Sequence, residues 1–293
     1  AGQTKMRDLR AADTDGDGRD EIYALSPEEG FIARSKFAED RLQFPQALPT
    51  TGKPYVLDLA PLAVGGDALR LAYVSRDEDD DYHLILQPLD TDTPEVAEYQ
   101  LDDQDDPPSA LRFADVNRDG RNDVLIFTPY APLRTLIQDA EGKFVEPGGD
   151  SGSQQGLLKD AKAPGFCYAD VDGDGKPEVL LAQRTFVRAL VMNAEGAWEI
   201  KDQFNAPGTD AEITGVTVLP RPGAKRPDLI MYDKRAQEVH VFVPATGGTY
   251  ELSRSVDVGG FDLRAIAVAP LAGTDDPTLM LMDKRRVALV LPD

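Results

Sequence analysis

Apolar and polar residues alternate with a period of two along much of the chain, which is the pattern of a half-buried β-strand. Clear examples are Tyr55–Leu59, His83–Leu86 and Val239–Val243. Short runs of Gly, Pro, Asp and Asn separate these segments, and such residues favour turns. No segment shows the 3.6-residue apolar stripe of an amphipathic helix. The pattern therefore predicts an all-β protein.

One acidic stretch of nine residues, D-x-[DN]-x-D-G-x-x-[DE], occurs three times and begins at Asp13, Asp115 and Asp170. We call these stretches the first loop (13–21), the second loop (115–123) and the third loop (170–178). Each lies between a small or apolar run and a strand-like run. The first interval is about twice the second, which indicates another copy between them. That copy exists, and two more follow the third loop.

The three additional copies hold a proline where the loops hold their first aspartate, at Pro61, Pro220 and Pro270. The chain thus contains six repeats of about 50 residues, a period typical of propellers and solenoids. Repeats begin near residues 8, 55, 110, 165, 213 and 263. We interpret residues 1–293 as a single β-propeller domain.

Four short strands in each repeat are typical of a propeller blade. We expect six blades of four-stranded antiparallel sheet, with seven blades as the alternative if a long stretch between loops hides one more. The sixth repeat has room for about three strands, roughly 263–271, 277–283 and 286–292. Either the N-terminal segment completes this blade, or it stays three-stranded, or the native protein is longer.

The spacing of the loops suits calcium, a hard cation that takes six to eight oxygen ligands. Side chains at positions 1, 3 and 5 converge if the backbone curls, and the glycine at position 6 permits that turn. Position 7 offers its carbonyl oxygen, and the carboxylate at position 9 closes the shell. An EF-hand is excluded because its position 12 requires glutamate, whereas Ala24, Ile126 and Leu181 stand there.

We therefore predict three calcium sites. The predicted ligands are Asp13, Asp15, Asp17, Arg19 and Glu21 in the first loop, Asp115, Asn117, Asp119, Arg121 and Asp123 in the second, and Asp170, Asp172, Asp174, Lys176 and Glu178 in the third, with Arg19, Arg121 and Lys176 acting through their carbonyls.

On these loops and their repetition, the chain resembles the FG-GAP/VCBS repeat family, known from the calcium-bearing propeller blades of integrin α-subunits and from many secreted bacterial proteins. The resemblance covers essentially the whole chain as repeats. It implies the propeller fold and the calcium ions. It implies no particular partner, because a fold alone does not define a function.

The net charge of −21 argues against nucleic-acid binding and against an anionic membrane surface. No apolar run approaches 18 residues, so we expect no direct membrane insertion. Calcium loops of this kind are filled where calcium is millimolar, which favours a secreted, extracellular or periplasmic protein. Cys167, the single cysteine, is predicted to be a buried thiol.

Basic residues stand at turns that we place on the face opposite the calcium hairpins: Arg184, Lys234, Arg235, Lys284 and Arg285. Acidic turns in the first two repeats contrast with them. One interpretation is an anion-binding rim, because arginine suits carboxylates. The other is that these charges keep hairpin tips soluble and protect sheet edges.

No catalytic motif stands out, and both histidines, His83 and His240, lie in strand patterns that favour structural roles. We therefore predict that the protein is not an enzyme. It is interpreted as an interaction or cell-adhesion scaffold whose partner is a protein or an acidic glycan, and membership of a larger assembly stays open. A lectin-like protein is the alternative, although Trp198 is the only tryptophan, and a calcium-dependent polysaccharide lyase is the third.

Overall fold

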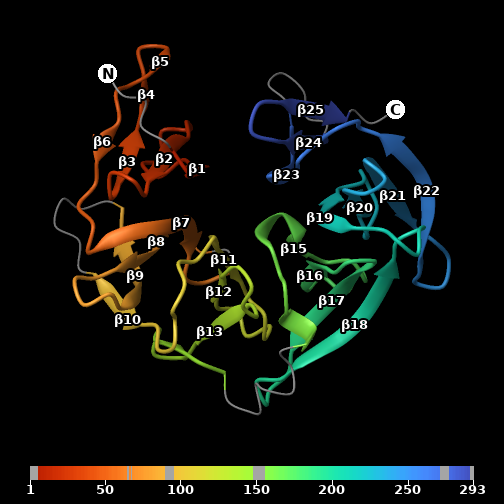
Figure 1. Ribbon diagram of the computed structural model, residues 1–293, viewed down its shortest axis with the longest axis horizontal. Helices are drawn as coiled ribbons and strands as arrows, with labels where there is room; N and C mark the ends of the chain where they lie inside the picture. The colour runs from red at the N-terminus through yellow and green to blue at the C-terminus, as the bar shows by residue number, and fades with distance from the viewer. Residues whose placement is uncertain are drawn as a thin grey trace. The chain divides into compact units, whose positions relative to one another are not determined.

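The computed structural model describes residues 6–64, 66, 68–89, 96–147, 156–270 and 277–290 (Figure 1). Its strands are β1 (Asp8–Ala12), β2 (Glu21–Ser26), β3 (Phe31–Ser35), β4 (Phe37–Ala38), β5 (Arg41–Leu42), β6 (Gln46–Ala47), β7 (Lys53–Pro61), β8 (Leu69–Arg76), β9 (Tyr82–Pro88), β10 (Ala97–Gln100), β11 (Ala110–Ala114), β12 (Asp123–Phe127), β13 (Arg134–Gln138), β14 (Phe144–Val145), β15 (Phe166–Ala169), β16 (Glu178–Ala182), β17 (Phe186–Met192), β18 (Trp198–Asn205), β19 (Ile213–Leu219), β20 (Asp228–Asp233), β21 (Glu238–Pro244), β22 (Tyr250–Asp257), β23 (Ala265–Pro270), β24 (Pro277–Met282) and β25 (Val287–Val290). A short 3-10 helix, η1 (Ala163–Gly165), precedes β15. Within the described residues, no helix is long and apolar enough to cross a membrane.

The strands form antiparallel sheets that follow the repeats. Five sheets have four strands each, in the orders β1-β2-β3-β6, β10-β9-β8-β7, β11-β12-β13-β14, β15-β16-β17-β18 and β19-β20-β21-β22. The sixth, β23-β24-β25, has three strands in the described part of the chain, and β4 and β5 form a separate small hairpin. The fold is an all-β six-bladed β-propeller with mostly four-stranded antiparallel blades. The six-blade prediction is confirmed, and the seven-blade alternative is wrong.

The chain divides into two compact units. The first unit comprises residues 1–115 and 119–147 and contains the sheets built from β1 to β14. The second unit comprises residues 116–118 and 148–293 and contains the sheets built from β15 to β25. Residues 116–118, within the second loop, thus pack with the second unit, and the amide of Met192 donates a hydrogen bond to the carbonyl of Val116 at 2.8 Å.

Alternation along the inner strands explains the core of the first unit. In β8, Leu71 and Tyr73 point to one apolar cluster, and Ala72 and Val74 point to the other. The first cluster joins β8 to β2 through residues such as Tyr23, and the second cluster joins it to β12. Because both faces of these strands are buried, the sheets stack against one another and β8 reads as a nearly continuous apolar run.

The second unit repeats this arrangement. Leu229 and Met231 of β20 pack with Leu180 of β16, whereas Ile230 and Tyr232 on the opposite face pack with residues of β24 such as Leu281. The antiparallel order also fixes where the turns lie, because successive turns alternate between the two ends of a sheet. In the sheet β15-β16-β17-β18, the third loop, which joins β15 to β16, therefore lies at one end, and the turn after β16 lies at the other. The turns after β20 and β24 likewise join the second strand of their own sheets to the third.

Candidate metal centre

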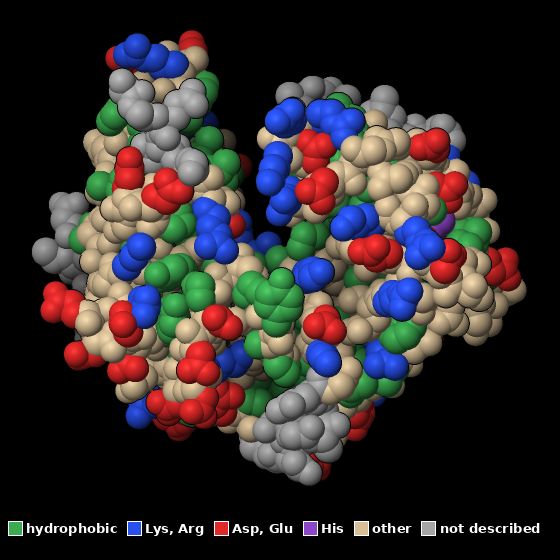
Figure 2. All heavy atoms as spheres, in the orientation of Figure 1, with side chains coloured by type: hydrophobic (Ala, Val, Ile, Leu, Met, Phe, Trp, Pro, Cys, Tyr) green, Lys and Arg blue, Asp and Glu red, His purple; other side chains and the backbone are tan. Residues whose placement is uncertain are grey.

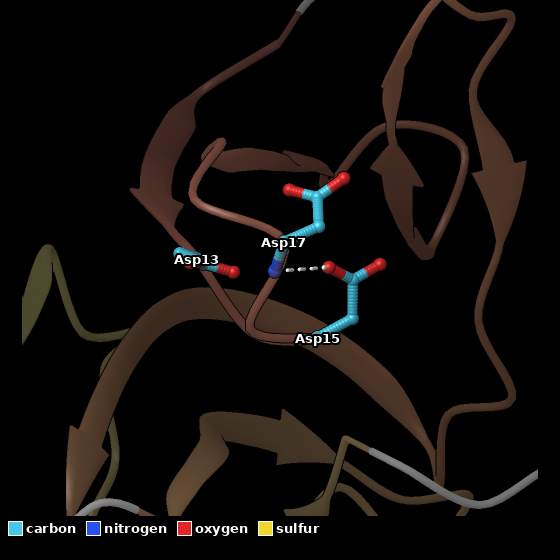
Figure 3. A group of neighbouring side chains, drawn as sticks. All are labelled: Asp13, Asp15 and Asp17. Carbon is cyan, nitrogen blue, oxygen red and sulfur yellow. Dashed lines mark hydrogen bonds between the residues drawn. The ribbon is translucent and has the colours of Figure 1, made fainter.

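The first loop joins β1 to β2 and is organised by its own aspartates. Both carboxylate oxygens of Asp13 accept backbone hydrogen bonds, one from Gly16 at 2.7 Å and one from Gly18 at 2.8 Å. The amide of Asp17 donates to Asp15 Oδ1 at 3.3 Å (Figure 3). These bonds curl the backbone so that one carboxylate oxygen of each aspartate lies within 4.8 Å of the others. Gly16 and Gly18 have left-handed φ angles of 76° and 83°, which glycine tolerates without steric cost.

Glu21, at position 9 of the first loop, is the first residue of β2 and only 2% exposed. Its Oε2 accepts a hydrogen bond from the backbone amide of Thr14, at position 2, at 2.9 Å. This bond fastens the end of the loop to its start. A carboxylate is thereby held beside the aspartate cluster and away from solvent.

The third loop has the same construction. Asp170 accepts hydrogen bonds from Gly173 at 2.6 Å and from Gly175 at 2.8 Å. Glu178, at position 9, is 1% exposed and begins β16. Asp170, Asp172 and Glu178 each bring an oxygen within 4.8 Å of the others. Burial raises the pKa of Glu178, and the charges of Asp172 and Asp170 raise it further, against the opposing effects of the Val171 amide and Arg118.

These two clusters fit a calcium ion in the chemistry of their donors. All the converging side chains are carboxylates, which are the hard oxygen ligands that calcium prefers. A buried carboxylate among other carboxylates is costly unless a cation compensates it. Glu21 and Glu178 are buried in this way, and Arg118 already brings one positive charge to Glu178. The clusters could hold metal ions, and bound calcium would add compensating charge.

The second loop differs at position 9, where it has the shorter Asp123. Asp115 accepts hydrogen bonds from the amides of Asp119 and Gly120, both at 2.9 Å, so the turn itself is similar. Asp123 is fully buried, and its Oδ1 accepts a hydrogen bond from the amide of Gln138 at 2.9 Å. In the described residues, only the first and third loops bring three carboxylates within 4.8 Å. Calcium at the second loop therefore stays a prediction.

Basic side chains contact the predicted ligands, and sequence reasoning missed them. Lys36 Nζ lies 2.7 Å from Asp15 Oδ2, and this hydrogen bond lowers the pKa of Asp15. In the third loop, Arg118 Nη1 lies 3.2 Å from Asp174 Oδ2. Nothing in the sequence marks Lys36 as a neighbour of the first loop, because the fold brings it there. Arg118 could have been noticed from the sequence, since it stands at position 4, where the other two loops have glycine.

The predicted basic rim falls in three turns of the second unit: 183–185, 234–237 and 283–286. Residues 212 and 213 link the first two turns, because Ile213 donates to the carbonyl of Arg184 at 2.9 Å and Lys234 donates to the carbonyl of Glu212 at 2.8 Å. Lys and Arg side chains also gather over β23 to β25 on the face shown in Figure 2.

Asp233 and Asp283 shape two of these turns in the same way. Asp233 Oδ1 accepts the amides of Arg235 at 2.9 Å and Ala236 at 3.2 Å, and Asp283 Oδ1 accepts the amides of Arg285 at 2.7 Å and Arg286 at 2.8 Å. Each aspartate is followed directly by lysine and arginine. This repeated Asp-Lys-Arg sequence was the available signal that the two turns are equivalent.

Two of the five predicted rim residues form side-chain ion pairs with acidic residues in the described part of the chain. Lys234 Nζ lies 3.8 Å from Glu212 and Arg235 Nε lies 3.0 Å from Asp210. Arg184, Lys284 and Arg285 form no side-chain ion pair with any residue that the structure describes. The rim therefore keeps a net positive charge in a strongly acidic chain.

A cavity of about 490 Å³ lies beside Arg235 and is also lined by Asp233, His240 and Ser255. His240 is 3% exposed, and its Nδ1 lies 2.8 Å from Ser255 Oγ. The arrangement has the residue types of a hydrolase triad, but His240 Nε2 lies 3.7 Å from Asp233 Oδ2, beyond hydrogen-bond distance. Burial raises the pKa of the Cys167 thiol to about 11, which favours its protonated form at neutral pH.

Comparison with known proteins agrees with the repeat and with the fold. The family described as FG-GAP-like repeat matches residues 115–181, which span the second and third loops. A search of curated proteins finds no match.

Two solved structures are similar in fold. One is a functionally unknown protein from Desulfotomaculum acetoxidans DSM 771, with a TM-score of 0.53 and 12% identity over 86% of this chain and 70% of that one. The other is BBS1N in complex with ARL6DN, soaked with lead, with a TM-score of 0.54 and 13% identity over 96% of this chain and 89% of that one. At such identities the likeness concerns the fold alone. Residues 115–181 thus form an FG-GAP-like repeat within a six-bladed β-propeller.

Proposed function

We propose that the chain is a non-catalytic, calcium-binding β-propeller that serves as an interaction scaffold outside the cell or in a periplasm. The observation that carries this proposal is the association of converging aspartates with a buried glutamate, Glu21 or Glu178, in two hairpins of the same design. Calcium bound there would stabilise the hairpins by neutralising these carboxylates. Sites in extracellular modules fill at about 10⁻⁴–10⁻³ M calcium, which is why we propose a calcium-rich compartment.

Isothermal titration with calcium, combined with metal analysis, tests this role. We expect at least two ions per chain, lost together in the double variant Asp17→Asn and Asp174→Asn. A matched control exchanges two exposed aspartates outside the loops, Asp105→Asn and Asp202→Asn, and should bind as the parent protein does. Lack of binding at about 5 mM calcium would overturn the proposal, because extracellular modules fill below that concentration.

The same proposal assigns the basic rim of the second unit to an acidic protein surface. Its support is the positive charge of Arg184, Lys284 and Arg285, which have no ion-pair partner among the described residues. Arginine binds carboxylates through two parallel hydrogen bonds and is frequent in protein interfaces.

A protein partner is favoured over a sugar by the scarcity of aromatic residues for stacking. No Phe, Tyr or Trp lines the cavity beside Arg235, and the chain has a single tryptophan. BBS1N, which has a similar fold, was crystallised in complex with ARL6DN. This likeness motivates a search for a protein partner and carries no information on its identity.

Two acidic polymers serve as probes for the rim, poly-L-glutamate for a protein and polygalacturonate for a glycan. We expect poly-L-glutamate to bind at low salt and to lose at least tenfold in affinity when Arg184, Lys284 and Arg285 are changed to glutamate. The control variant reverses three exposed cations elsewhere, Arg41, Lys143 and Lys201. Stronger binding of polygalacturonate, lost in the same rim variant, would favour the lectin-like alternative. Equal loss in the control variant would show non-specific charge binding and overturn the rim assignment.

A further inference from the structure

Arg118 occupies position 4 of the second loop, where the first and third loops have Gly16 and Gly173. All three residues have left-handed φ angles, 62° at Arg118, 76° at Gly16 and 84° at Gly173. Glycine adopts this conformation freely, whereas a residue with a side chain pays a steric cost. An arginine that keeps the conformation must be held there by its contacts.

Those contacts lie in the third loop. Arg118 Nη1 is 3.2 Å from Asp174 Oδ2, and Nη2 donates to the carbonyl oxygen of Lys176 at 3.2 Å. The same Nη2 donates to Glu178 Oε1. Arg118 and the third loop belong to the same compact unit. The three acceptors are positions 5, 7 and 9 of the loop, which are three of its five predicted calcium ligands.

A guanidinium group and a calcium ion would bind the same oxygens of the third loop. Both are cations that attract carboxylate and carbonyl oxygens, and the guanidinium fork directs several N–H groups at them at once. The side chain of Arg118 is only 20% exposed and that of Glu178 only 1%, so water screens their attraction weakly. A calcium ion on the same three oxygens would stand beside this positive charge, and the two cations would repel each other.

The first loop has a much weaker counterpart. Lys36 contacts one ligand, Asp15, and both side chains are more than a third exposed, at 44% and 37%. A lysine in that position loses little when a metal ion displaces it, because an exposed ion pair contributes little stability. The two loops are therefore alike in their ligands and different in the cation that already contacts those ligands.

We propose that Arg118 is a built-in competitor of calcium at the third loop. Its guanidinium holds positions 5, 7 and 9, stabilises the loop without metal and lowers its calcium affinity below that of the first loop. Calcium binding at the third loop then requires Arg118 to move off its acceptors, so the two loops fill at different calcium concentrations. This inference rests on the proposed calcium binding by the third loop and adds an order of filling.

Calcium titration of the third loop alone tests the competition. The parent for this experiment carries Asp17→Asn and Asp119→Asn, which disable the first and second loops and leave the third intact. On that parent, Arg118→Gly restores the residue found in the other two loops, and Arg118→Gln removes the charge. We expect both to bind calcium at least tenfold more tightly, with Arg118→Lys in between because it keeps the charge without the fork.

A neighbouring arginine provides the control. Arg226 Nε donates to the carbonyl of Val171 at 2.7 Å, so it contacts the third loop without contacting a predicted ligand. Arg226→Gln should leave the calcium affinity within twofold of the parent. Thermal unfolding gives a second readout, because Arg118→Gln should lower the melting temperature of the calcium-free protein and largely lose this defect when calcium is saturating.

The possible results of these experiments distinguish the competitor role of Arg118 from calcium binding by the third loop itself. Calcium binding that is unchanged or weaker in both Arg118→Gly and Arg118→Gln would overturn the competitor role while leaving calcium binding intact. A melting temperature of Arg118→Gln that stays equally low with and without calcium would indicate a purely structural ion pair and would also overturn it. No calcium binding in the parent or in any Arg118 variant would overturn calcium binding at this loop, and the competition with it.

Discussion

Glu178 Oε2 accepts a hydrogen bond from the backbone amide of Val171 at 3.0 Å, which joins the first residue of β16 to the second residue of the loop before it. The first loop has the same bond between Glu21 and Thr14. Each glutamate thus uses one carboxylate oxygen to close its loop, and the other oxygen of Glu178 accepts a hydrogen bond from Arg118 Nη2. Position 9 is for this reason both a structural residue of the hairpin and a predicted metal ligand.

Replacement of this carboxylate should separate the two roles. We expect Glu178→Gln to lower the calcium affinity of the third loop at least tenfold, because an amide brings one neutral oxygen where a charged one stood. The calcium-free protein should also lose about 1–3 kcal/mol of stability, since Arg118 would face a neutral amide in place of a buried carboxylate. Titration calorimetry and chemical denaturation measure the two effects. Glu195→Gln, in an exposed turn, is the control, and a loss of affinity there would contradict the assignment.

Removal of calcium should destabilise the whole protein. A ligand that binds only the folded state stabilises it by about 2.7 kcal/mol for each site when its free concentration is a hundred times its dissociation constant. For the first and third loops together, we expect chelation to lower the melting temperature by roughly 10–20 °C. Scanning calorimetry with excess calcium and then with EGTA measures the difference. Equal melting temperatures would contradict a stabilising role for calcium.

The sequence predicted the fold well because its strongest signal is repeated. Each loop lies between two strand-like runs, and the residues after it, such as Glu178 and the apolar run that follows, became the start of β16. Repetition every 50 residues or so then indicated the blades without loops, where Pro61 ends β7 and Pro270 ends β23. The strand pattern within each repeat and the spacing of the repeats indicate the same fold, and such agreement makes a prediction reliable.

The chemistry around the loops was much less predictable. Lys36 and Arg118 reach Asp15 and Asp174 from 21 and 56 residues away in the chain. The pairing of β2 with β3 within one sheet brings Lys36 to the first loop, whereas only the tertiary fold brings Arg118 to the third loop. The second loop also looked equivalent to the others, although its sequence differs from them at positions 3, 4 and 9, which are Asn117, Arg118 and Asp123. Asp123 accepts a hydrogen bond from the amide of Gln138 on β13, a contact that the motif alone does not predict.

Metal stoichiometry decides whether the second loop binds calcium. We predict that Asp119→Ala lowers the number of bound ions by one, because Asp119 is a predicted ligand of that loop alone. Its effect on the other two sites should be small, since its carboxylate accepts the amide of Arg121 at 2.9 Å and contacts the guanidinium of the same residue, both within its own loop. Metal analysis after gel filtration in calcium counts the ions. An unchanged count in Asp119→Ala would remove the second loop from the ligand assignment.

The acid stability of the basic rim should depend on Asp233. Burial alone would raise the pKa of this carboxyl, but hydrogen bonds from the amides of Glu212, Ala236 and Arg235 outweigh it and hold the pKa below its ordinary value of 3.8. The unfolded chain therefore takes up the proton more readily than the folded protein does. It follows that the stability contributed by Asp233 is complete above about pH 4 and is lost as the pH falls through the lower, folded value.

Asp233→Asn removes this dependence while keeping a side-chain oxygen for the turn amides. We expect the variant to be less stable than the parent at pH 6 by about 1 kcal/mol, because bonds to a neutral acceptor are weaker than bonds to a carboxylate. The difference should shrink as the pH falls below 4, where the parent loses its own charge. Urea denaturation between pH 3 and 6 follows both proteins. Asp202→Asn, on an exposed strand, should show no such convergence, and a gap between Asp233→Asn and the parent that widens in acid would contradict the role given to this carboxylate.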